Sequence, residues 1–160
     1  MALIATLMNI SLYAMAGVFI IAMAPVAEVL VKNAQVAAAA WGEPGHGMAG
    51  RQVSETNVRS MEFSSVISLV LILVFAVIAV FITNEIYEVD GFRQVQVMDY
   101  WAMIAAAIAG LIVSVATGFL MARRCNRVFG MVNGDILGAT NEISRITVMA
   151  VMILVYMVVV

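Results

Sequence analysis

Three long stretches of the sequence carry no charged residue, and this pattern constrains the fold more than any other feature does. They run from residue 2 to 27, from 63 to 83 and from 100 to 122. At a rise of about 1.5 Å per residue, a helix of each length can cross the roughly 30 Å of hydrocarbon in a bilayer. A fourth apolar stretch, 146–160, is shorter, so its helix must begin upstream, near Ile136, in order to span.

We therefore predict an all-α fold, an integral membrane bundle of about four transmembrane helices in one domain. The helices are expected at about 2–31, 63–83, 99–121 and 136–160, with polar loops at about 32–62 and 122–135. The composition agrees, because 64% of the residues are hydrophobic and 11% are charged, against about 25% charged in a typical soluble domain. A soluble globular domain is thereby excluded.

The basic residues are distributed unevenly between the polar segments, and this asymmetry predicts an orientation. The first and third segments hold most of the basic residues, namely Lys32, Arg51, Arg59, Arg123, Arg124 and Arg127. The segment between them, 84–98, has Arg93 together with three acidic residues. Because cytoplasmic loops are enriched in Lys and Arg, we expect 32–62 and 122–135 to face the cytoplasm of a cell membrane. The segment 84–98 and both chain termini are then expected outside.

The first polar segment offers two weaker signals. Glu28 precedes Lys32 by four residues, the favourable orientation for an ion pair along a helix. This pair could hold a helix end at the interface, or it could line the wall of a cytoplasmic site. Further on, residues 42–50 hold four glycines and a proline, which argues against a helix interior. The resulting loop carries His46 and could close over a ligand or merely connect two helices.

Small residues recur at every fourth position of the third apolar stretch. Ala106, Gly110, Ser114 and Gly118 would share one stripe of a helix and would let another helix approach closely. The pattern leaves packing within the chain and contact in a dimer equally open.

The last polar segment and the helix that follows it carry the strongest indication of a site. Asp135 is expected at the helix N-cap, with Glu142 and Arg145 farther along the same face. Facing hydrocarbon, these groups would cost several kcal/mol. We therefore expect the stripe to face protein, water or a ligand.

The chemistry of this stripe predicts a phosphate or diphosphate site. A helix N-terminus and nearby arginines attract phosphate oxygens, while carboxylates hold a Mg²⁺ ion that bridges them. Asp135 and Glu142 are accordingly expected to bind Mg²⁺ and to act in catalysis. The residues expected to bind substrate phosphate are Arg123, Arg124, Arg127, Asn133, Gly134, Lys32 and Glu28. Three simpler interpretations stay open: arginines that only mark the cytoplasmic side, Asp135 as a cap alone, and Glu142 with Arg145 as an internal ion pair.

Residues 127–142, Arg-Val-Phe-Gly-Met-Val-Asn-Gly-Asp-Ile-Leu-Gly-Ala-Thr-Asn-Glu, also resemble a known signature. They are similar to the C-terminal motif of the cobalamin synthases, the adenosylcobinamide-GDP ribazoletransferases, in which Thr-Gly-Asp-x-Leu-Gly-Ala follows a glycine-rich turn. Asn133 stands where that family usually has Thr. The stretch 28–50 resembles the middle region of the family more loosely. The resemblance implies a membrane transferase that joins adenosylcobinamide-GDP to α-ribazole or its phosphate, with release of GMP and with the help of Mg²⁺.

One departure from the family concerns its Asp-rich metal-binding motif, Asp-Gly-x-x-Asp-x-x-Asp-Gly, because no such spacing occurs in this sequence. The chain therefore looks like the C-terminal part of a family member. The expected partners are the two substrates, membrane lipid, and either an N-terminal half protein or further copies of the chain, and not nucleic acid. The alternative function is a non-catalytic membrane subunit or a small transporter component, with the polar stripe lining a pathway.

Overall fold

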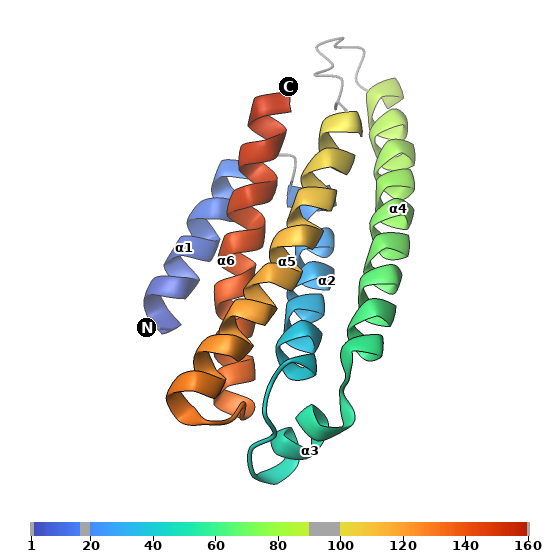
Figure 1. The fold of residues 1–160 in the computed structure, drawn as a ribbon. Helices are drawn as coiled ribbons and strands as arrows, with labels where there is room; N and C mark the ends of the chain where they lie inside the picture. The colour runs from blue at the N-terminus through green and yellow to red at the C-terminus, as the bar shows by residue number, and fades with distance from the viewer. Residues whose placement is uncertain (1, 17–19, 90–99, 160) are drawn as a thin grey trace.

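The structure is a computed structural model that describes residues 2–16, 20–89 and 100–159, and in these ranges it is a helical bundle (Figure 1). The described residues form six helices and include no β-strand, only one isolated bridge between loops. The helices are α1 (Ala2–Ala16), α2 (Ile20–Ala40), α3 (Gly47–Glu55), α4 (Val58–Val89), α5 (Tyr100–Phe129) and α6 (Gly134–Val159). The predicted all-α membrane bundle is confirmed.

The prediction of one helix over residues 2–31 is wrong. The chain forms α1 and then α2, which runs in the opposite direction (Figure 1). The division lets α1 pack against both α2 and α6. As a result α1 begins part-way along the bundle, so the two termini do not lie at the same end as predicted.

The other helices are longer than predicted, and the polar loops are correspondingly shorter. Helix α4 begins at Val58, α5 ends at Phe129 and α6 begins at Gly134. Helix α3 occupies part of the predicted glycine-rich loop, with Gly50 in its interior. A side chain at position 50 would collide with the carbonyl group of Gly45. This close approach is a packing reason for the glycine, which the sequence indicated only as a helix breaker.

The small residues on α5 pack inside the chain, which decides between the two alternatives that the sequence left open. Ala106 and Ser114 are fully buried. A side chain added at Gly118 would collide with the Ala34 carbonyl oxygen and lie 2.6 Å from the β-carbon of Ala37. The α5 stripe is therefore the surface on which α2 packs, at backbone distance.

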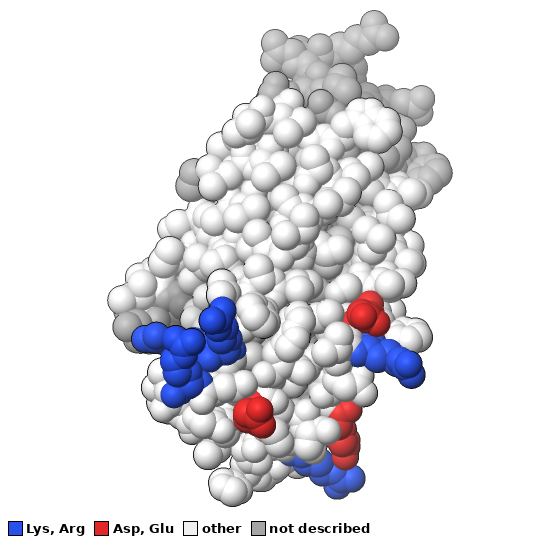
Figure 2. All heavy atoms as spheres, in the orientation of Figure 1, with Lys and Arg blue, Asp and Glu red and all other residues white. Residues whose placement is uncertain are grey.

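Three helices in the described part of the chain are long and apolar enough to cross a membrane, namely α4 over Val58–Ile78, α5 over Trp101–Phe129 and α6. Helix α2 carries Glu28 and Lys32 and is not among them. The Lys, Arg, Asp and Glu side chains that Figure 2 draws gather at one end of the molecule. This end, where α2 leads into α3 and α5 leads into α6, is called the loop end below.

The two connections at the loop end are tied together by hydrogen bonds. The Val132 amide donates to the Glu43 carbonyl oxygen at 2.7 Å, and the Gly45 amide donates back to the Val132 carbonyl oxygen at 3.3 Å. The Asn126 side chain adds two more bonds, accepting from the Glu43 amide and donating to the Trp41 carbonyl oxygen. Residues from opposite halves of the sequence are thereby held as one unit.

Candidate functional site

A polar cavity of about 490 Å³ lies at the loop end, between α2, α3 and the first turns of α6. We call it the α6 cavity. Its lining comes from three separate parts of the sequence: Lys32, Gln35, Val36, Ala39, Ala49, Gln52, Thr56, Gly134, Leu137 and Gly138. The lining holds one cation, two amides and the start of a helix, and it holds no carboxylate. An anionic group fits such a lining, because a lysine, amide N–H groups and a helix N-terminus all attract negative charge.

The N-cap of α6 is Asn133, and the expectation that Asp135 would occupy this position is wrong. The Asn133 side-chain oxygen accepts a hydrogen bond from the Ile136 amide at 3.0 Å, and its carbonyl oxygen accepts from the Leu137 amide at 3.0 Å. This cap explains why Asn133 can stand where the similar signature has Thr, because both residues cap helices with a side-chain oxygen. Within the described residues, the amides of Gly134 and Asp135 keep no hydrogen-bond acceptor.

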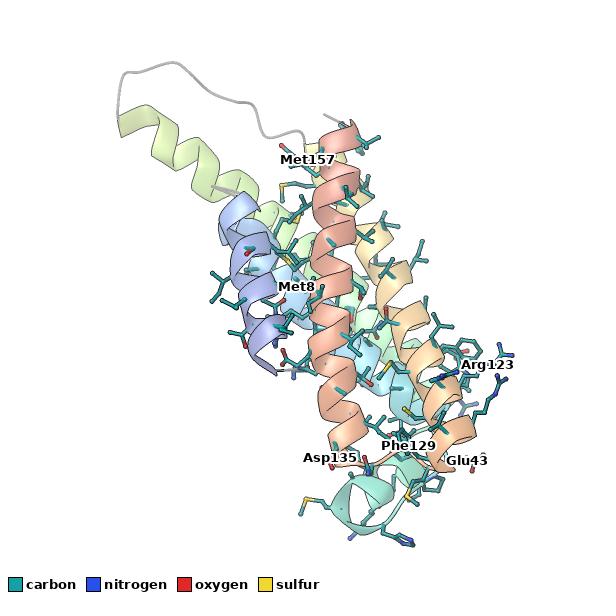
Figure 3. The ribbon with its side chains drawn as sticks, turned by 90° about the vertical axis from the view of Figure 1, so that its left-hand side faces the viewer. Met8, Glu43, Arg123, Phe129, Asp135 and Met157 are labelled. Atoms are coloured by element: carbon teal, nitrogen blue, oxygen red, sulfur yellow. The ribbon has the colours of Figure 1, made fainter. Side chains whose placement is uncertain are left out.

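Asp135 is exposed in the first turn of α6, and Figure 3 shows it at the loop end close to α3. Its neighbour Gly134 lines the α6 cavity. A carboxylate in the first turn stabilises the helix through the macrodipole. Since the capping is carried by Asn133, the carboxylate of Asp135 is left exposed beside the residue that lines the cavity.

Glu142 and Arg145 form an internal ion pair that also includes Glu28. Arg145 donates to the two carboxylate oxygens of Glu28 at 2.8 and 3.2 Å and to Glu142 at 3.0 Å. The Arg145 side chain is 20% exposed, and the two carboxylates are about twice as exposed. A planar guanidinium that binds one carboxylate with two parallel bonds is a strong and directional contact. The pair of Glu28 with Arg145 therefore joins α2 to α6, and Glu142 holds the same guanidinium group from within α6.

Lys32 lies beside this ion pair and faces α6. Its ammonium group donates to the Asn141 side-chain oxygen at 3.0 Å and to Gln35 at 3.4 Å, and Gln35 donates to the Leu137 carbonyl oxygen at 3.1 Å. Lys32 thus bonds across to α6, a contact that the helical spacing of Glu28 and Lys32 did not indicate. These bonds fix the ammonium group on the wall of the α6 cavity.

The three arginines near the end of α5 lie away from this cavity. Arg123, Arg124 and Arg127 are exposed, and the α6 cavity is not lined by any of them. Figure 3 shows Arg123 well separated from Asp135, across the loop end. The structure therefore brings Lys32 and Gly134 together at the cavity and leaves the arginines on another face.

The residues present fit a Mg²⁺ ion only in part. Asp135 and Glu142 are seven residues apart, about 10 Å along a helix axis, and Glu142 is bound to Arg145. No group of three or more His, Cys, Asp or Glu side chains gathers in the part of the chain that the structure describes, and His46 is exposed on the loop before α3. Of the two carboxylates, Asp135 is exposed and makes no ion pair with another described residue, so its oxygens are the ones not already held by Arg145.

Sequence reasoning missed three polar residues that the fold brings to this region: Gln35, Gln52 and Asn141. Gln35 follows Lys32 by three residues and Asn141 precedes Glu142, so helical periodicity could have placed both beside known candidates. Gln52 had no such signal, because α3 was predicted as a loop. Its position on the cavity depends on where α3 packs.

Comparison with known proteins agrees with the resemblance found in the sequence. A curated relative, the adenosylcobinamide-GDP ribazoletransferase of Halorubrum lacusprofundi, is 44% identical over 46 residues, which are 29% of this chain and 18% of that protein. The aligned part thus spans less than one fifth of the relative's length. No solved structure matches. The family model described as cobalamin-5-phosphate synthase matches residues 1–153, and because this match covers nearly the whole sequence, the chain belongs to the cobalamin-5-phosphate synthase family.

Proposed function

We propose that this chain takes part in joining adenosylcobinamide-GDP to α-ribazole or α-ribazole phosphate, with release of GMP, and that the α6 cavity holds a phosphate group of this reaction. The observation that carries the proposal is the lining of the cavity: a fixed ammonium group, side-chain amides and the uncapped amides of a helix N-terminus. These groups match the chemistry of phosphate oxygens. Membership of the family supports the class of reaction.

The reaction joins an acceptor oxygen of the ribazole to the phosphorus next to cobinamide and breaks the bond between that phosphorus and the GMP oxygen. Negative charge grows on the leaving phosphate as this bond breaks. Lys32 and the amides of Gly134 and Asp135 would stabilise that charge, because Lys32 and Gly134 already line the cavity and the two amides have no acceptor among the described residues. The contribution of the chain is then orientation and charge neutralisation.

A Mg²⁺ ion would neutralise part of the negative charge of the diphosphate. In our proposal Asp135 holds this ion together with substrate oxygens, and Glu142 does not, because Arg145 binds it. Further carboxylates would come from a partner chain, either an N-terminal half protein that carries the Asp-rich motif or a second copy. We assign Arg123, Arg124 and Arg127 to membrane headgroups, to which exposed guanidinium groups near a span are attracted.

The test measures GMP release from adenosylcobinamide-GDP in the presence of α-ribazole and Mg²⁺. The chain is reconstituted in lipid, once by itself and once together with the N-terminal half protein that carries the Asp-rich motif. Lys32→Gln should lower the rate by about 100-fold, the usual effect of losing one charge-stabilising donor. Asp135→Asn should raise the Mg²⁺ concentration needed for activity. Arg51→Gln is the matched control, because Arg51 is exposed on α3 and pairs with Glu55. Absence of turnover under both conditions would refute the proposed reaction for this chain.

We also propose that the loop end faces the cytoplasm of a cell membrane, as the basic residues predict. Met48 is exposed on α3 at this end. A cysteine in place of Met48 should react with a membrane-impermeant thiol reagent in inverted vesicles and not in intact cells. The opposite result would place the cavity outside. Membership of the family does not favour the alternative of a non-catalytic subunit or transporter component.

A further inference from the structure

A second and larger cavity, of about 790 Å³, lies between α2 and α4. We call it the α4 groove. Its α4 wall extends from Arg59 to Leu71, which is about 18 Å along a helix axis. The groove shares Lys32, Val36 and Thr56 with the α6 cavity and otherwise has its own lining. A groove of this length beside a membrane helix can hold an elongated ligand.

The polarity of the groove changes along its length. At the loop end it is lined by the cations Lys32 and Arg59. Deeper along α4 the lining becomes apolar, with Phe63, Ile67 and Leu71. Of the two cations, Arg59 forms no ion pair with another described residue. The groove therefore offers positive charge at the interface and hydrocarbon below it.

Two serine hydroxyl groups alternate with these apolar side chains along the α4 wall. Ser64 and Ser68 are one helical turn apart and both line the groove. Neither hydroxyl makes a hydrogen bond within the part of the chain that the structure describes. Serines in helices commonly bond to the carbonyl oxygen four residues before, as Ser11 does. The two unpaired hydroxyls are therefore donors available to a ligand in the groove.

We propose that the α4 groove binds an anionic glycerophospholipid. The cationic end and the apolar side chains deeper along α4 match the headgroup and the acyl chains of such a lipid. The phosphate headgroup would lie at Lys32 and Arg59, the ester carbonyl oxygens would accept hydrogen bonds from Ser64 and Ser68, and an acyl chain would lie along Ile67 and Leu71. A soluble phosphate compound would use the cationic end alone and leave the serine hydroxyls and the apolar part unfilled. The lipid would lie against Lys32, on the wall shared with the α6 cavity.

The proposal is tested by photo-crosslinking of the purified chain in vesicles of phosphatidylcholine that contain a photoactivatable phosphatidylglycerol, with cross-links mapped by peptide mass spectrometry. Cross-links are expected between residues 56 and 71. Arg59→Gln should reduce them about fivefold, the factor expected for one basic residue near an anionic surface. Arg51→Gln, the same charge change at the same end but outside the groove, should leave them unchanged.

A second pair of variants separates a bound lipid from the general lipid shell. Ser64→Leu should reduce the cross-links by filling the groove, whereas Val66→Leu, on the exposed face of α4, should not. Equal labelling in Arg59→Gln and Arg51→Gln would overturn the proposal. So would full competition by unlabelled phosphatidylcholine, or displacement by soluble α-ribazole phosphate at concentrations that leave vesicles intact. These readouts do not depend on turnover, so failure of the transferase assay would leave them interpretable.

Discussion

The two sides of α2 are packed by opposite means. Toward α5, its residues Ala34 and Ala37 meet Gly118 at distances that exclude any larger side chain. Toward α4, the same helix packs against Ile72 and accepts a hydrogen bond from Ser65 through Asn33, but the α4 groove with its unpaired hydroxyls lies between the two helices near the loop end. The side toward α5 and α6 is closed by small residues and bonded polar groups, and the side toward α4 is open along the groove.

The difference shows where this small bundle can bind a ligand. Within a membrane, helices associate through close packing and hydrogen bonds, because lipid tails are as apolar as the side chains. The closed side satisfies both conditions, with Asn33 donating to Ser114 at 3.1 Å in the buried interface. On the open side the groups that would close the interface stay available. Four substitutions test this contrast, given from the largest expected effect to the smallest.

Gly118→Ala should lower the free energy of unfolding in detergent by about 3 kcal/mol, because overpacking at a backbone contact forces α2 and α5 apart. The same substitution at Gly138 should raise it by about 0.5–1 kcal/mol, since the site has open space and alanine favours a helix. Chemical denaturation followed by circular dichroism measures both. Equal changes in the free energy of unfolding at the two glycines would show that α2 and α5 are not closely packed at Gly118.

Arg145→Gln should cost about 2 kcal/mol, because it leaves the carboxylates of Glu28 and Glu142 without their shared partner. This value lies between the roughly 0–1 kcal/mol of exposed pairs and the 3–5 kcal/mol of buried ones. The comparison is Arg51→Gln, which breaks the exposed Arg51–Glu55 pair and should cost about 0.4 kcal/mol. A similar cost for both would mean that the Arg145 contacts do not join α2 to α6.

Asn133→Ala should destabilise the chain by about 1 kcal/mol through loss of the α6 cap. Asn133→Thr should keep most of the stability, because Thr also caps helices. Thermal unfolding distinguishes the two variants. If Thr were as destabilising as Ala, the side-chain bond to the Ile136 amide would not be the reason for a polar residue at this position.

Ser114→Ala should cost about 0.6 kcal/mol, the average for a hydrogen bond between membrane helices, because it removes the partner of Asn33. Ser64→Ala, on the open side, should change stability by less than about 0.5 kcal/mol, since its hydroxyl has no partner among the described residues. The two variants are to be compared under identical conditions. A larger loss at Ser64 would show that its hydroxyl contributes to the packing of α4 and is not available to a ligand.

The apolar runs predicted the bundle and the three later spans well, because the absence of charge over a bilayer's thickness has few structural solutions. They failed at residues 2–31, where an apolar run long enough for one helix is divided between α1 and α2. Hydropathy alone does not distinguish a long helix from a hairpin of two. The partner surface on α6 decides this, and that surface is remote in the sequence.

The placement of the candidate residues was predicted correctly where they are close in one segment and incorrectly where they come from several. Gly134 and Asp135 were identified at the start of the last helix because turn chemistry is local. The grouping of Arg123 with Asp135 relied on closeness in sequence, and the structure separates the two residues across the loop end (Figure 3). The hydrogen bond of Lys32 to Asn141 joins residues far apart in the sequence, and nothing local indicates it.

The sequence by itself determined a membrane-embedded helical bundle, the end at which its charges gather, and the motif that opens α6. These follow from hydropathy and local turn chemistry, which act over a few neighbouring residues. Only the tertiary structure decided that Arg145 is held by Glu28, that Asn133 rather than Asp135 caps α6, and that α2 is closed on one side and open on the other. Each of these depends on contacts between distant segments, whose geometry is set by how the helices pack.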